Sequence, residues 1–197
     1  DIRREYLWFV LVMAATATWV TFSICFIILP YPYAFYAANL SYLGIIAMPI
    51  LLLRFALKFS GSRAAGSFLA TWAVWLIPSL SVLLMLTNAW HQLFWTNVYR
   101  GTLFAGNFIL TLEFGPWYWV HTIYSYAIIL VAIVILVYTT YKRKMHNILL
   151  LLPLGIALPL GTSMMFIFGT THIDYTPVML SFSCVAFGWA ITSGFYS

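Results

Sequence analysis

Long apolar stretches, separated by short segments that carry the charged residues, set the pattern of this chain. The uninterrupted stretches are Tyr6 to Leu53, Ala64 to Tyr99, Phe114 to Tyr141, Met145 to Ile173 and Tyr175 to Ser197. A helix that crosses the hydrocarbon core of a bilayer needs about 20 apolar residues, so every stretch is long enough to cross once. The first is long enough to cross twice. The pattern predicts a membrane protein that crosses the bilayer several times.

Six helices fit these stretches and predict an all-α, polytopic transmembrane bundle that forms a single domain over residues 1–197. Proline, glycine and serine mark the breaks between helices, as in the segments 30–33 and 60–63. All connections except 89–116 are short, so consecutive helices should pack antiparallel. The predicted helices cover residues 7–29, 36–57, 67–88, 117–138, 147–168 and 177–196.

Composition excludes a soluble domain, and the charges predict an orientation. Apolar residues make up 64% of the chain and charged residues 7%, against about 25% charged in ordinary soluble domains. The formal net charge is +5, but the basic residues are spread over short loops and form no stripe for nucleic acid. All of them except Arg100 fall on one side of the predicted bundle. Because short cytoplasmic loops carry the excess of lysine and arginine, both ends should be cytoplasmic and residues 89–116 extracytoplasmic.

The long connection of residues 89–116 predicts an extracytoplasmic β-hairpin over residues 94–115. With a two-residue Gly-Asn turn at 106–107, Arg100 faces Glu113 and two threonines face each other. Charged and hydroxyl pairs then share one face of the hairpin and apolar residues the other, an arrangement that stabilises paired strands. We expect the apolar face to cover the outer mouth of the bundle as a lid. An irregular loop, or a helix lying in the membrane interface, is the alternative.

Polar and aromatic residues gather at the predicted outer ends of the helices. Polar groups in a membrane bundle turn inward, because hydrocarbon leaves their hydrogen-bonding groups without partners. We therefore expect a polar-lined pocket with aromatic walls, which binds a ligand through several of Asn88, His91, Trp95, Trp117, His121, Tyr124 and Asp174. The alternative is structural: the histidines make hydrogen bonds at the interface, and Asp174 caps the helix that starts near residue 177.

Motifs of enzymes and pumps are missing from the sequence. It holds no phosphate-binding loop, catalytic serine elbow or metal-binding His-Glu-x-x-His or Cys-x-x-Cys pattern. We expect no catalytic residue, no metal site and no enzymatic activity in this chain. The predicted spans also hold no carboxylates, and ion or proton pumping usually requires charged side chains there.

Several segments, in order, resemble a known family. They are TNAWHQLFW at 87–95, GPWYWVHTIYSY at 115–126, YLGI at 42–45 and DYTP at 174–177. The chain resembles the N-terminal seven-helix sensor region of bacterial histidine kinases, which also precedes cyclic-dinucleotide enzymes. The resemblance implies seven helices, so that the six predicted here are the second to seventh and the first precedes Asp1. It also implies a bacterial cytoplasmic membrane and an output domain that follows the last helix.

Three functional hypotheses follow from these observations. The leading one is a receptor module that senses a small molecule, lipid or ion at its outer face, contacts membrane lipids, uses no cofactor and dimerises through its output domain. The second is an electron-transfer subunit that holds haem or quinone between His91 and His121. The third is a channel or permease. None of the three involves nucleic acid.

Overall fold

The computed structural model describes residues 2–62, 68–102, 108–144, 146–168 and 174–193. Within them lie seven helices and a two-stranded antiparallel sheet. Six of the helices are long and α4 is a single turn. In chain order the elements are α1 (Ile2–Ile28), α2 (Tyr33–Phe59), α3 (Phe68–Leu86), α4 (Asn88–His91), β1 (Trp95–Thr102), β2 (Phe108–Phe114), α5 (Pro116–Lys142), α6 (His146–Ile167) and α7 (Thr176–Ser193).

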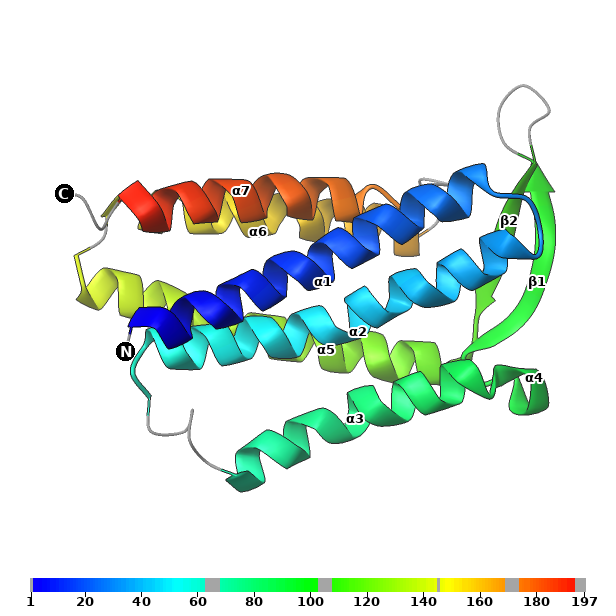
Figure 1. The fold of residues 1–197 in the computed structure, drawn as a ribbon, viewed down its shortest axis with the longest axis horizontal. Coiled ribbons are helices and arrows are strands. Elements are labelled where there is room, and N and C mark those ends of the chain that lie inside the picture. The colour runs from blue at the N-terminus through cyan, green and yellow to red at the C-terminus, as the bar shows by residue number, and fades with distance from the viewer. Residues whose placement is uncertain (1, 63–67, 103–107, 145, 169–173, 194–197) are drawn as a thin grey trace.

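The six long helices form a bundle with the β-hairpin at one end (Figure 1). α2 and α5 pack together in the middle, α1, α6 and α7 lie on one side of them, and α3 packs on the other. α1 begins and α7 ends at the end of the bundle opposite the hairpin. The all-α membrane bundle predicted from the sequence is confirmed, with six long helices among the described residues.

Three of the helices are long and apolar enough to cross a membrane within the described residues: Leu7–Ile28, Tyr33–Phe59 and Pro116–Lys142. Shorter apolar segments belong to the other three long helices. Many large apolar side chains on the outside of the bundle are exposed, among them Leu86, Val185 and Trp189. So many exposed apolar side chains are expected on a surface that contacts the apolar tails of lipids.

Close backbone approach and interlocking side chains hold the helices together. A Cβ atom added at Gly44 of α2 would lie 2.5 Å from the Ala15 carbonyl oxygen and 2.8 Å from the Trp19 nitrogen of α1. Small residues allow this approach, and dispersion contacts drive helix association in lipid. The buried residues Ala56 and Ala132 belong to a core shared by α1, α2, α5 and α7.

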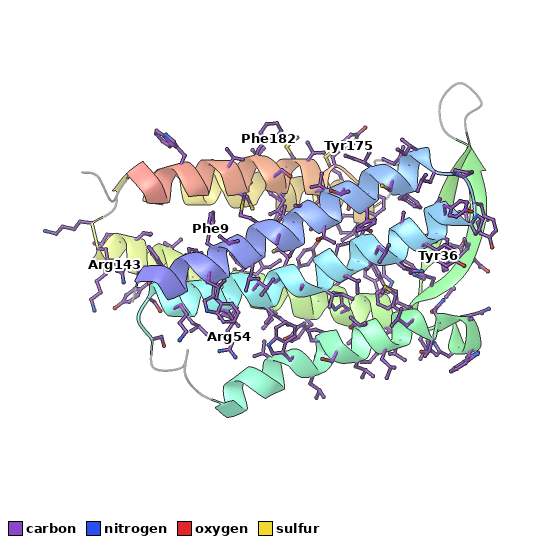
Figure 2. All side chains as sticks on the ribbon, in the orientation of Figure 1. Phe9, Tyr36, Arg54, Arg143, Tyr175 and Phe182 are labelled. Atoms are coloured by element: carbon purple, nitrogen blue, oxygen red, sulfur yellow. The ribbon has the colours of Figure 1, made fainter. Side chains whose placement is uncertain are left out.

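Basic side chains mark the end of the bundle opposite the hairpin (Figure 2). Arg143, just after α5, donates from Nη2 to the Phe59 carbonyl oxygen at 2.7 Å. Its guanidinium also lies 4.8 Å from the centre of the Phe59 ring, within the range of a cation–π interaction. Lys58 and Lys142 lie in the last turns of α2 and α5. Arg143, Lys58 and Lys142 therefore lie together at this end of the bundle.

The hairpin exists, but its predicted register is wrong. Arg100 opposes Leu110 rather than Glu113, and the last pair joins Thr102 to Phe108. The predicted two-residue turn at 106–107 lies outside the described residues. The side chain of Glu113 instead accepts a hydrogen bond from Asn97 Nδ2 at 2.7 Å.

The core at the base of the hairpin explains the shift in register. Trp95 is 1% exposed and pairs with Phe114, whose ring stacks on Tyr118 at 3.9 Å with an interplanar angle of 7°. The pairing is irregular between Trp95 and Val98. Burial of these large rings decides where the strands begin, and it outweighs the fractions of a kcal/mol that an exposed charge pair contributes.

The predicted third helix also ends earlier than expected. Its periodicity predicted a helix through residue 88, whereas α3 ends at Leu86 and the short α4 begins at Asn88 after a turn at Thr87. α4 in turn ends at Gln92, which adopts the left-handed conformation with φ of 53°. The two breaks redirect the chain across the end of the bundle and into β1.

Candidate functional site

Asn88 anchors the hairpin to the end of α3. Its Oδ1 accepts hydrogen bonds from the backbone nitrogens of Phe94 at 2.9 Å and Trp95 at 3.0 Å, and its Nδ2 donates to the Trp95 carbonyl oxygen at 2.9 Å. The Asn88 side chain is buried, with 9% exposed. It satisfies backbone groups that would otherwise be buried without partners at the start of β1.

Trp95 is the centre of an aromatic cluster. Its ring makes edge contacts with Tyr42 at 4.7 Å and Phe94 at 4.9 Å, measured between ring centroids. Its indole nitrogen donates to Asn39 Oδ1 of α2 at 3.2 Å. Met85 and Tyr118 complete the buried part of the cluster. The cluster therefore joins the hairpin to α2, α3 and α5.

His121 and Ser81 form a second polar centre, between α5 and α3. His121 is 2% exposed; its Nδ1 lies 3.2 Å from Ser81 Oγ and its Nε2 lies 3.2 Å from Ser125 Oγ. Ser81 donates its hydroxyl hydrogen to the Ile77 carbonyl oxygen at 2.8 Å and accepts from Trp117 Nε1 at 3.0 Å. Because that hydrogen is already used, His121 Nδ1 must be the donor to Ser81. The hydrogen bonds thus place a proton on His121 Nδ1.

His91 makes separate contacts on α4. Its Nδ1 accepts from the Leu93 backbone nitrogen at 3.0 Å, and its Nε2 lies 3.0 Å from Thr87 Oγ1. Thr87 donates its own hydrogen to the Leu83 carbonyl oxygen at 2.8 Å, so His91 Nε2 donates to Thr87. Both ring nitrogens are engaged in holding the turn between α3 and β1.

Tyr124 and Asp174 lie away from these two centres. The Tyr124 hydroxyl donates to the Val74 carbonyl oxygen of α3. Asp174 Oδ1 accepts from the Thr176 backbone nitrogen at 2.9 Å, at the start of α7. Burial raises the pKa of the Asp174 carboxyl, and hydrogen bonding by Thr176 opposes part of that rise. The structural alternative for Asp174, a role in capping the last helix, agrees with this contact.

The structure thus groups the predicted residues into separate contacts rather than one pocket wall. Asn88 and Trp95 bind each other, and Trp117 and His121 share Ser81, whereas His91, Tyr124 and Asp174 each have other partners. Asn39 and Phe94 were not predicted. An amide in an otherwise apolar helix was the signal for Asn39, because such a group needs a buried partner.

Both ring nitrogens of His91 and of His121 take part in hydrogen bonds. All four nitrogens have a partner among the described residues, and axial ligation would break one of these bonds at each histidine. The described residues also include no group of three His, Cys, Asp or Glu side chains that could hold a metal ion. The geometry suits a structural junction between the hairpin and the helices.

The chain was compared with known families and proteins. The family model described as the N-terminal 7TM region of histidine kinase matches residues 2–194. No curated protein and no solved structure matches the chain. The family match covers nearly the whole length, and the helical bundle agrees with it. This chain therefore belongs to the family of N-terminal 7TM regions of histidine kinases, and it is a multi-pass membrane protein of the sensing type.

Proposed function

We propose that this chain is the sensing part of a receptor in a bacterial cytoplasmic membrane. It detects a small molecule, lipid or ion from the hairpin end and passes the change to an output domain in the cytoplasm, either a histidine kinase or a cyclic-dinucleotide enzyme. The output domain also holds two copies together as a homodimer. The chain itself carries out no catalysis, uses no cofactor and binds no nucleic acid.

The distribution of charge supports the proposed orientation. Arg143, Lys58 and Lys142 lie at the end of the bundle opposite the hairpin. Lysine and arginine are enriched in short cytoplasmic loops. With this end in the cytoplasm, the start of α1 and the end of α7 face the cytoplasm and the hairpin faces outward.

The attachment of the hairpin to three long helices is the observation that carries the proposal. Trp95 binds Asn39 of α2 and packs in one buried cluster with Met85 of α3, and Asn88 of α4, just after α3, binds the start of β1. The backbone nitrogens of Gly115 and Trp117 donate to the carbonyl oxygens of Phe94 at 2.8 Å and Leu93 at 2.9 Å, where α5 begins. A movement of the hairpin therefore acts on α2, α3 and α5 together.

A ligand acts in this scheme by favouring one of two helix packings. It shifts their populations only as far as its affinities for the two packings differ. The predicted site residues Asn88, His91, Trp95, Trp117, His121 and Tyr124 then act mainly as the junction that transmits the shift. Asp174 positions the start of α7, which leads to the cytoplasmic end.

Spin-label distances at the cytoplasmic end test this proposal. The intact protein is placed in nanodiscs with Cys25 and Cys184 replaced by alanine and labels at Lys58→Cys and Lys142→Cys. We expect Asn88→Ala to change the distribution of distances between the labels and the activity of the output domain. Asn97→Ala, which removes only the exposed contact with Glu113, is the matched control. Identical distributions in the two variants would contradict transmission from the hairpin.

A further inference from the structure

A cavity of about 130 Å³ lies inside the bundle, away from the hairpin junction. Its walls come from α1, α2, α5, α6 and α7, and they include Trp19, Met48, Ile129, Pro159 and Leu180. None of the buried residues of the aromatic cluster around Trp95 lines it. It is therefore a second site, separate from the aromatic cluster around Trp95. Its volume is comparable to that of an apolar protein cavity of about 150 Å³ that binds benzene.

The cavity is long and narrow. Its lining runs from Met48 to Phe59 along α2 and from Phe9 to Trp19 along α1, which corresponds to about 15 Å at the rise of an α-helix. Figure 2 shows Phe9 between α1 and α7. A volume of this size spread over this length fits an extended alkyl chain better than a compact ring.

One polar group in the wall has no hydrogen-bond partner. Thr176, the first residue of α7, is 5% exposed, and its buried Oγ1 has no hydrogen-bond partner among the residues that the structure describes. The neighbouring carboxyl of Asp174 accepts a hydrogen bond from the Thr176 backbone nitrogen at 2.9 Å rather than from the hydroxyl. A buried hydroxyl left without a partner costs about 1 to 3 kcal/mol. A polar group of a bound molecule would satisfy it.

The rest of the wall restricts the charge of that molecule. The described residues that line the cavity include no Lys, Arg, Asp, Glu or His. The Tyr126 hydroxyl and Ser163 Oγ, which also line it, already bind each other at 2.5 Å. An ionised group would lose its hydration there without gaining a counter-charge. The molecule that fits is therefore uncharged.

We propose that this cavity binds an uncharged alkyl compound with a single hydroxyl or carbonyl group, which hydrogen-bonds to Thr176. The chain of the compound lies along α1 and α2 toward Phe59. This names the ligand class of the receptor proposed above, and its signalling consequence rests on that proposed function. Because the compound contacts α7 as well as α1 and α2, its binding favours one packing of the last helix.

Photolabelling of the intact protein in phosphatidylcholine nanodiscs tests the binding. The probe is a ten-carbon primary alcohol with a diazirine in its chain, and unlabelled 1-decanol and decane are the competitors. We expect saturable labelling of peptides from α1, α2 and α7, with 1-decanol competing better than decane. Thr176→Val should weaken labelling about 3- to 10-fold, which is the contribution of one net hydrogen bond. Thr18→Val, which removes an α1 hydroxyl outside the cavity lining, should leave it unchanged.

A second pair of variants tests the cavity rather than the hydroxyl. Leu180→Phe fills the space and should abolish saturable labelling, while Val185→Phe, on the exposed face of α7, should not. Thr176→Val also removes an unpartnered hydroxyl, so the empty variant should unfold at a higher temperature than the unmodified protein. That result separates lost binding from misfolding. Equal labelling of Thr176→Val and Thr18→Val, or labelling that does not saturate, would overturn the inference.

The binding and the sensing proposals fail in different ways. If 1-decanol binds in the cavity without changing the spin-label distances between residues 58 and 142, the site stands and the sensing role is wrong. If Asn88→Ala changes those distances but no saturable labelling is found, the sensing role stands and the cavity inference is wrong.

Discussion

Asn88 holds both backbone polar groups of Trp95. Its Oδ1 accepts from the Trp95 nitrogen at 3.0 Å and its Nδ2 donates to the Trp95 carbonyl oxygen at 2.9 Å. The pair fixes the start of β1 against the end of α3 and places the indole ring in the aromatic cluster. The amide thus holds the start of the hairpin in the position in which the Trp95 side chain is buried.

Asn88→Ala should release the start of β1. The substitution leaves two backbone nitrogens and one carbonyl oxygen without their partner, and each buried group left unpaired costs about 1 to 3 kcal/mol. We expect the thermal unfolding midpoint in detergent to fall by several degrees and proteolysis within residues 95–114 to accelerate. Asn97→Ala, at an exposed position, should change neither. Equal protease resistance of the two variants would contradict the anchoring role.

The sequence predicts most of the fold because the helices depend on long apolar runs. All six predicted helices are present, and their bounds shift by at most five residues at either end. The break at Thr87 was not predicted, because the apolar residues continue through Leu86 without a mark of a turn. The turn is seen only in the structure, where the chain changes direction after α3. Helix formation is a local property, whereas the turn depends on where the hairpin must pack.

The hairpin and the site show the limit of local patterns. Opposite charges at Arg100 and Glu113 suggested a register, but burial of Trp95 and Phe114 sets the actual one. The polar residues of α3 and α5 were predicted to turn inward, and Ser81 and His121 do meet. The cavity lined by Thr176 depends on which faces of five helices meet, and a single sequence does not contain that information.

Ser81→Ala should uncouple α3 from α5. The substitution removes the acceptor for the buried His121 Nδ1 and for the half-buried Trp117 Nε1, and a buried donor left without a partner costs about 1 to 3 kcal/mol. In a double-mutant cycle with His121→Phe, the double variant should lose less unfolding free energy than the sum of the losses in the two single variants. We expect a difference of at least about 0.5 kcal/mol. Unfolding in detergent monitored by tryptophan fluorescence measures all four proteins. Strict additivity would show that the contact contributes nothing.

The orientation is tested by labelling single cysteines from outside the cell. After replacement of Cys25 and Cys184 by alanine, Tyr99→Cys on the exposed part of β1 should react with an impermeant maleimide in intact spheroplasts. Lys142→Cys, at the basic end of α5, should react only after the membrane is opened. The reverse pattern would mean that the basic end faces outward, contrary to the proposed topology.

Asp174→Asn should stabilise the protein at neutral pH but not in acid. Burial raises the pKa of this carboxyl above its ordinary value of 3.8, so the folded state holds its proton to higher pH than the unfolded state does. The free energy of unfolding therefore falls as pH rises from about 4 through the raised pKa and is constant above it. Asparagine keeps an oxygen acceptor for the Thr176 nitrogen. Because its side chain is uncharged, it avoids the cost of removing a carboxylate from water. Thermal unfolding in detergent should give the variant a higher midpoint than the unmodified protein at pH 7 and an equal midpoint below pH 4. An advantage that is the same at both pH values would show that the carboxylate charge carries no cost in the folded state.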